Sequence, residues 1–275
     1  MVHINSGGVK IAVFEYNREC SRQCGTGDTV VFLHGWPLSG KIFEYQVNLL
    51  VELGYHVVTI DFRGFGDSDA PVCGYDYNQM ALDVYNVVKA LGLSRISLAG
   101  FSMGGAVALR YARLFKNFQL KKLILLAAAA PRFTKDIGFP YGIDKRDVDA
   151  MIEKANLDRP ELCRNFVEEK LFSQPHSRAA KNWFIAIAES ASGIGTIKAA
   201  VSLRDEDGID DLKCINVPVF IIRGEKDTVV PVPLTDLQHR EMPGSTLFSL
   251  KNSAHGIIYD ELENFNNLLV KALVE

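Results

Sequence analysis

Stretches with the pattern of buried β-strands alternate with amphipathic helical stretches along the first half of this chain. Strand-like runs occupy 29–33, 55–60, 96–99 and 122–128, and helical patterns occupy 42–53, 77–92 and the segment from 103 to about 115. An opening hairpin is expected over 2–4 and 10–16, with its turn at 6–8. Strand and helix in regular alternation form parallel strand pairs with helices packed on the sheet. The pattern therefore predicts an α/β fold with a mostly parallel central sheet and helices on both faces.

The alternation stops after Pro131 and returns near the C-terminal end. Only helical patterns follow Pro131, at 145–157, from an Asp158-x-x-Glu161 capping sequence onward and at 178–191, before strand-like runs at 217–223 and 245–250 and a last helix at 257–273. A helical segment between two strands of one sheet is an insertion and not a tandem domain. We expect a core domain formed by 1–131 and 193–275, with residues 132–192 inserted as a helical cap.

Charge and hydropathy exclude several classes of partner. The net charge is −3, and the lysines and arginines are scattered along the chain, which offers no basic surface for nucleic acid or anionic lipid. The longest apolar run, 123–130, is too short to cross a bilayer. The first residues lack the basic and apolar regions of a secretory signal. We expect a cytoplasmic chain without nucleic-acid or membrane partners; the sequence leaves its oligomeric state open.

Cysteine usage indicates neither disulfides nor a metal centre. The five cysteines are Cys20, Cys24, Cys73, Cys163 and Cys214. An odd number without regular spacing argues against a disulfide framework and is typical of a reducing compartment. Cys20 and Cys24 form the closest pair, but no second Cys/His pair with the spacing of metal ligands accompanies them. We therefore expect no metal site and no cofactor.

The run Gly100-Phe101-Ser102-Met103-Gly104 lies between a predicted strand and a predicted helix. A serine that attacks a carbonyl must stand clear of the sheet on a tight turn, and small residues two positions away leave room for that turn. The helix that begins at Met103 directs free N–H groups toward a developing oxyanion. The pentapeptide alone is a weak signal, but this setting makes Ser102 the candidate nucleophile.

A serine nucleophile needs a base to take its proton, and the base needs an acid to orient it. Of the six histidines, only His255 follows the predicted strand 245–250 in a short polar loop before the last helix. This position is the sheet edge at which open α/β folds bind their ligands. His255 is therefore the candidate base.

The acid is expected directly after strand 217–223, where Asp227 is the candidate and Glu225 its local rival. Four other aspartates have the pattern of solvated charges near a helix end: Asp205, Asp207, Asp210 and Asp211. The order is then Ser102, Asp227, His255, with each residue behind a different predicted strand. This is the order of nucleophile, acid and histidine in serine hydrolases with an α/β sheet.

Two backbone N–H groups are expected to stabilise a tetrahedral intermediate. One is that of Met103, the residue after the nucleophile. The other lies in the loop His34-Gly35-Trp36-Pro37, where Trp36 is our choice because proline has no N–H to donate. His34 is then expected to shape this loop and not to act as a base.

Five sequence blocks resemble the signatures of the α/β-hydrolase superfamily: 34–37, 61–68, 100–105, 224–227 and 253–256. The resemblance covers nearly the whole chain and is thinnest over 132–192. Within the superfamily, Trp36, Phe101 and the segment 211–219 resemble the cofactor-free haloperoxidase and aryl-esterase group. The resemblance implies the same triad and the same two N–H donors, without haem or metal. It also implies a side reaction in which peroxide intercepts the acyl-serine and yields a peracid that oxidises halide.

The serine separates this chain from some members of the superfamily. Haloalkane dehalogenases and epoxide hydrolases of this fold carry aspartate at the nucleophile position, which argues against an alkyl-enzyme mechanism. Carbon–carbon bond hydrolases often have asparagine before the serine, where this chain has Phe101. That difference disfavours this class without removing it.

The cap is expected to close over Ser102 and to shape an apolar pocket. The candidate pocket residues are Phe101, Phe133, Phe139, Trp183, Phe184 and Ile257. For the aromatic residues of the cap, packing between cap and core is the alternative. A further group, Asp61, Arg63, Gly64 and Gly66, is expected to build a structural loop at the sheet edge.

These features predict a serine hydrolase that cleaves small carboxylic esters through an acyl-enzyme on Ser102, with perhydrolase or cofactor-free haloperoxidase side activity. Its partner is a small-molecule ester or acyl substrate. The alternatives are a lactonase, a carbon–carbon bond hydrolase, an acyltransferase, or a small-molecule receptor or signalling protein that keeps the triad with little turnover.

Overall fold

The computed structural model describes residues 1–19 and 28–275. Their strands form one sheet of eight, in the order β1-β2-β4-β3-β5-β6-β7-β8. The first two strands form an antiparallel hairpin at one edge, and every pair from β4 to β8 is parallel. The strands are β1 Val2–Ser6, β2 Val9–Tyr16, β3 Thr29–Leu33, β4 His56–Ile60, β5 Ile96–Phe101, β6 Leu120–Leu126, β7 Val219–Gly224 and β8 Thr246–Leu250. The mostly parallel sheet predicted from the sequence is confirmed.

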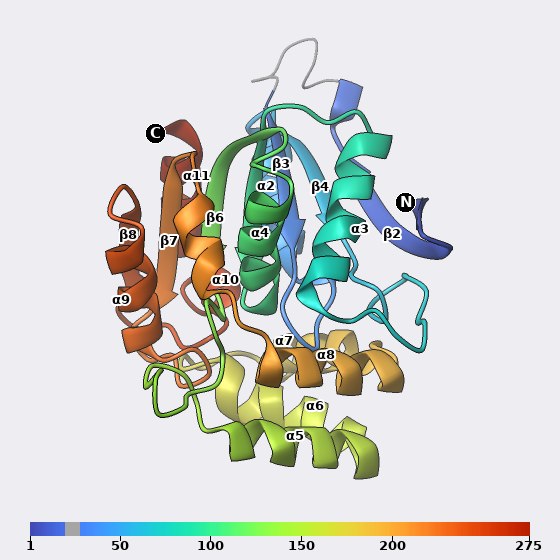
Figure 1. Ribbon diagram of the computed structural model, residues 1–275, viewed down its shortest axis with the longest axis vertical. Helices are drawn as coiled ribbons and strands as arrows, with labels where there is room; N and C mark the ends of the chain where they lie inside the picture. The colour runs from blue at the N-terminus through green and yellow to red at the C-terminus, as the bar shows by residue number, and fades with distance from the viewer. Residues whose placement is uncertain (20–27) are drawn as a thin grey trace.

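Helices cover both faces of the sheet (Figure 1). One hydrophobic cluster joins the sheet to α3, α4 and α9, and a second joins it to α2 and α11. The helices of the core are η1 Gly40–Phe43, α2 Glu44–Glu52, α3 Tyr77–Ala90, α4 Met103–Leu114, η3 Ile209–Cys214, α9 Val232–Glu241, α10 Ile257–Asp260 and α11 Leu262–Val274. Because both faces are covered, the central strand β3 is buried along its whole length.

The remaining helices lie together beyond the carboxyl ends of the parallel strands, at the bottom of Figure 1. They are α5 Lys145–Leu157, α6 Arg159–Asn165, the π-helix η2 Phe166–Leu171, α7 Arg178–Glu189 and α8 Gly193–Asp205. Asp158 accepts a hydrogen bond from the Glu161 amide at 3.1 Å and caps α6, as its spacing indicates. We propose that 132–192 acts as the inserted cap, next to which α8 lies.

The structure differs from the sequence-based expectations at several elements. The helices α8 and α9 were not expected, and the last helix is broken at Glu261, whose ψ of 62° is not helical. Asp211 is not a solvated charge: it is 1% exposed and accepts hydrogen bonds from Arg110 and Arg113. A buried carboxylate needs such partners, and both arginines lie on α4, far from Asp211 in the sequence.

Two further expectations concern cysteines and membranes. Cys73 and Cys214 are exposed and Cys163 is buried, whereas Cys20 and Cys24 lie outside the described residues. Within the part of the chain that the structure describes, no single helix is long and apolar enough to span a bilayer. Only α7 and α8 taken together have the required length and apolar composition, and the pair is bent by 90°.

The loop that follows β4 is held by buried polar contacts. Asp61 accepts hydrogen bonds from the amides of Gly40 and Asp67, at 2.8 and 2.9 Å. Arg63 forms two hydrogen bonds with Asp83 on α3, of 2.7 Å from Nε and 2.8 Å from Nη2, and both side chains are buried. The loop is thereby fixed to η1 and to α3.

We expect Arg63→Leu to lower the free energy of unfolding by about 3–5 kcal/mol, because it leaves the Asp83 carboxylate buried without its cation. Urea unfolding of the purified variant measures this loss. Lys213→Leu is the control, since it removes an exposed ion pair with Asp210 and is expected to leave the unfolding midpoint almost unchanged. Equal effects of the two substitutions would contradict the prediction.

Candidate active site

Ser102 lies on the turn that joins β5 to α4. Its φ of 53° and ψ of −118° are unusual for a residue with a side chain, and this conformation lifts the serine above the sheet. The turn is possible because α4 passes very close to β3: a Cβ on Gly104 would lie 2.4 Å from the Leu33 carbonyl oxygen. Glycine at this position is therefore required for the close approach.

His255 and Asp227 lie behind β8 and β7 and are joined by a hydrogen bond. The His255 Nδ1 and Asp227 Oδ2 atoms are 2.8 Å apart, and both side chains are buried. Asp227 Oδ1 accepts hydrogen bonds from the backbone amides of Val229 and Val230, each at 2.8 Å. Within the described residues, His255 Nε2 has no hydrogen-bond partner. The carboxylate thus fixes Nδ1 as the donor, which leaves Nε2 free to accept a proton.

The loop that follows β3 brings Trp36 to the same edge of the sheet. The Trp36 indole donates to the Thr196 carbonyl on α8 at 2.8 Å. Neither the backbone N–H of Trp36 nor that of Met103 has an acceptor within residues 1–19 and 28–275. Free amides beside a serine on a strand-to-helix turn are the groups that an oxyanion would need.

His34 supports this loop from below. Its Nδ1 lies 2.9 Å from the Gly35 carbonyl oxygen, and its Nε2 lies 3.0 Å from the Phe62 nitrogen. The carbonyl can only accept and the amide can only donate, so the ring is neutral with its proton on Nδ1. Burial lowers the pKa of His34 to about 4, against the opposing effect of the Gly35 hydrogen bond. A shaping role for His34 agrees with these contacts.

The lowered pKa of His34 predicts a loss of stability in acid. Below pH 6.5 the unfolded chain binds a proton at His34, because the histidine pKa there is about 6.5. The folded chain does not bind this proton until the pH approaches 4. The contribution of neutral His34 is therefore complete above pH 6.5 and is lost as the pH falls toward 4, by about 3 kcal/mol in total. Urea titrations at several pH values are expected to show this slope in the wild type and a smaller one in His34→Asn. Identical slopes would contradict the prediction.

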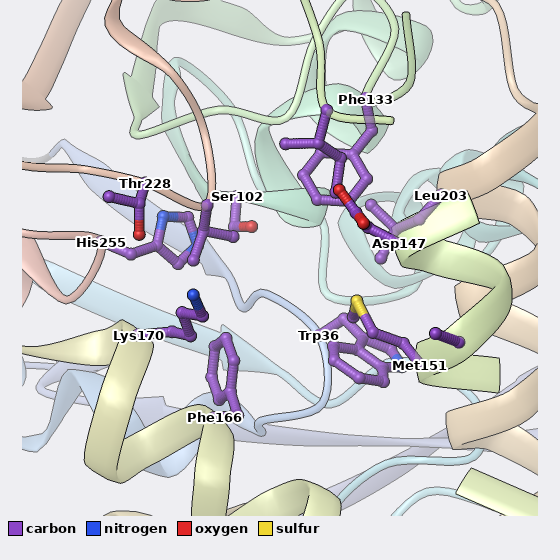
Figure 2. Close-up of a pocket in the computed structure, with 13 residues that line it drawn as sticks. Trp36, Ser102, Phe133, Asp147, Met151, Phe166, Lys170, Leu203, Thr228 and His255 are labelled. Atoms are coloured by element: carbon purple, nitrogen blue, oxygen red, sulfur yellow. The ribbon is translucent and has the colours of Figure 1, made fainter. Parts of the chain in front are cut away.

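Ser102 and His255 open into one cavity of about 360 Å³ at the carboxyl edge of the sheet (Figure 2). Its wall is mostly apolar, and its charged side chains are those of Lys170 on η2 and Asp147 on α5. The lining residues are Trp36, Ser102, Phe133, Ile143, Asp147, Ala150, Met151, Phe166, Lys170, Leu203, Thr228, Val229 and His255. Ser102 and His255 therefore line the same mostly apolar cavity.

Of the six side chains expected to line the pocket, Phe133 lies in this wall and the other five do not. Phe101 is buried beneath the site, with its ring centre 4.9 Å from that of His255. Phe184 and Ile257 are buried in the second hydrophobic cluster, and Trp183 packs on its edge. Phe139 packs against Tyr141. Trp183 contacts Tyr45 and Phe184 contacts Tyr259, so these two side chains pack between cap and core, which was the alternative.

The cap contributes other residues to the cavity, which the sequence did not single out as pocket residues. Met151 and Asp147 come from α5, and Phe166 and Lys170 come from η2 (Figure 2). Met151 belongs to the apolar stripe that predicts α5, but a stripe cannot tell which of its members face a cavity. Thr228 and Val229 directly follow Asp227, so their proximity to the site could have been inferred from the sequence.

The chain belongs to the alpha/beta hydrolase family, whose family model matches residues 28–262. It is 44% identical to the AB hydrolase superfamily protein YisY of Bacillus subtilis over 251 residues, which covers 90% of this chain and 92% of that protein. Its structure superimposes on an esterase from Exiguobacterium antarcticum with a TM-score of 0.94 at 41% identity, over 100% of this chain and 99% of that one. A bromoperoxidase from Bacillus anthracis gives a TM-score of 0.92 at 31% identity, over the same shares.

Proposed function

We propose that this chain is a serine hydrolase that cleaves small carboxylic esters through an acyl-enzyme on Ser102. One observation carries the proposal: Ser102 and His255 line the same mostly apolar cavity, and His255 Nδ1 is held by Asp227 while its Nε2 has no hydrogen-bond partner among the described residues. This is the arrangement that a nucleophile, base and acid require. The similarity to an esterase over the whole chain supports the same reaction class.

In the proposed reaction, His255 Nε2 takes the Ser102 proton as Oγ attacks the ester carbonyl carbon. The N–H groups of Trp36 and Met103 stabilise the oxyanion of the tetrahedral intermediate. Asp227 stabilises the imidazolium, which then protonates the leaving alkoxide. Water, activated by the same histidine, attacks the acyl-serine and releases the carboxylic acid, and the enzyme returns to its starting state.

The cavity also restricts the proposed substrate. A volume of about 360 Å³ is at the small end of ligand sites and fits a short acyl group with a compact alcohol. Its mostly apolar wall favours aliphatic or aromatic esters over sugars. Hydrogen peroxide is small enough to replace water in the second step, and the similarity to a bromoperoxidase supports this perhydrolase side reaction.

A fluorophosphonate probe and a panel of p-nitrophenyl esters test the proposal together. We expect one covalent adduct, on Ser102, and faster hydrolysis of the acetate and butyrate than of the octanoate. Peracid formation in peroxide is expected to require the same serine. An adduct on Ser102 without turnover of any ester would favour the receptor alternative, and labelling elsewhere would refute the assignment of the nucleophile.

A further inference from the structure

The carboxylate of Asp260, at the end of α10, accepts hydrogen bonds from two separate segments of the chain. Ala254 N donates to Oδ2 at 2.7 Å, and Ser173 donates to the same oxygen from its N and its Oγ, each at 2.9 Å. Gln174 N donates to Oδ1 at 2.9 Å, and His176 Nε2 lies 3.0 Å from Oδ1. Asp260 is 5% exposed, so these partners replace water around it.

The two segments are the loop of His255 and the connection between η2 and α7. Ala254 directly precedes His255 in the chain. On the other side of the histidine, the Gly256 amide donates a hydrogen bond of 2.6 Å to the carbonyl of Leu171, which is the last residue of η2. The backbone before His255 is attached to the segment 171–176 through Asp260 and through the Asn252 carbonyl, which accepts hydrogen bonds from Ser173 Oγ and Gln174 Nε2. The backbone after His255 is attached directly, at Gly256.

The charge of Asp260 suits this role. Burial opposes its ionisation, but the amides of Ser173, Ala254 and Gln174 and the His176 side chain together lower its pKa below the usual value. The group is thus a carboxylate at neutral pH and accepts all of its donors at once. A neutral side chain of the same shape offers one accepting oxygen in place of two.

The same attachment reaches the cavity wall. Phe166 and Lys170 line the cavity from η2, and η2 ends at Leu171, where the attached segment begins. The Phe166 ring also lies beside His255, with ring centres 6.4 Å apart. A displacement of the segment would move this wall relative to the imidazole.

We propose that Asp260 is a positioning residue for His255: it ties the segment 171–176 to the histidine loop and so keeps Nε2 directed into the cavity beside Ser102. The inference rests on the proposed function in taking His255 as the base. It adds that the cap wall and the base are held as one unit by a carboxylate that does not itself touch the substrate.

Asp260→Ala tests the proposal against a matched control, Asp211→Ala. Both remove a buried, multiply bonded carboxylate, but Asp211 binds Arg110 and Arg113 on α4 and has no contact with the histidine loop. We expect Asp260→Ala to lower kcat for p-nitrophenyl acetate about 10- to 100-fold with little change in KM, because a displaced base misaligns the reacting atoms. Asp211→Ala is expected to keep kcat within about twofold at a temperature where both variants are folded, since it changes stability alone.

Asp260→Asn is the second variant, to be measured if Asp260→Ala does not fold. Its single accepting oxygen can serve either Ala254 and Ser173 or Gln174 and His176, but not both pairs. We expect kcat between those of the wild type and Asp260→Ala, which is the partial rescue that a positioning role predicts.

A measurement independent of turnover separates this proposal from the proposed function. The proton between His255 Nδ1 and Asp227 is expected to give a low-field NMR resonance in the wild type and in Asp211→Ala, and to broaden or disappear in Asp260→Ala. Wild-type kcat together with an unchanged resonance in Asp260→Ala or Asp260→Asn would overturn the positioning role. If the wild type hydrolyses no ester, the proposed function fails, and the resonance still decides whether Asp260 positions His255.

Discussion

Replacement of Ser102 by alanine is expected to lower kcat for p-nitrophenyl acetate by about 10⁴-fold or more, because it removes the oxygen that His255 activates and that receives the acyl group. The structure predicts that the protein stays folded: the Ser102 hydroxyl makes no hydrogen bond among the described residues, so its loss leaves no buried partner unsatisfied. Steady-state kinetics and thermal unfolding of the same preparation measure the two effects.

Ser39→Ala is the matched control for this experiment. The Ser39 hydroxyl is also buried and without a partner in the described part of the chain, but Ser39 does not line the cavity. We expect its turnover to remain within about twofold of the wild type, since only a nucleophile changes the reaction path. Hydrolysis that persists in purified Ser102→Ala would refute the acyl-enzyme mechanism.

The second large effect is expected for Asp227→Asn, with a fall in kcat of about 10⁴-fold. The amides of Val229 and Val230 both donate to Oδ1, so the asparagine oxygen remains with them and its NH₂ group turns toward His255. An NH₂ group can only donate, which forces Nδ1 to accept and moves the imidazole proton to Nε2. The base then has no lone pair facing Ser102.

Glu225→Gln is the control for Asp227→Asn, because Glu225 is the acidic neighbour that the sequence left as a rival. Its carboxylate lies 3.2 Å from the Arg223 guanidinium on the outside of the molecule, and it has no contact with His255. We expect kcat close to that of the wild type. A larger fall in kcat for Glu225→Gln than for Asp227→Asn would make Glu225, and not Asp227, the acid that orients His255.

Local patterns predicted the strands of the sheet, because each pattern reports a local requirement. The run 29–33 is apolar at successive positions since β3 is covered on both faces, and this burial is visible in five residues. The helix α8 was missed for the opposite reason. Gly193 and Gly195 have the composition of a loop, yet a Cβ on Gly195 would lie 2.6 Å from the Gly64 carbonyl oxygen. Gly195 is required because the loop around Gly64 approaches it closely, and a contact between segments so far apart cannot be recognised from the local sequence.

The cap shows the same limit at the site. Hydrophobic periodicity identified its helices, but a helix that packs on one side and lines a cavity on the other gives one broad apolar stripe. Phe184 and Met151 are both apolar residues on cap helices, and only the packing of those helices assigns the first to the core and the second to the cavity.

The sequence by itself determined the fold class, the family resemblance and the candidate order Ser102, Asp227, His255, because a strand, its turn and the residue behind it are neighbours in the chain. The tertiary structure alone decided which cap residues line the cavity, that Asp211 is buried, and that Asp260 joins the histidine loop to the segment 171–176. These facts depend on contacts between residues that are far apart in the sequence. The type of a side chain does not show which distant residue it will contact.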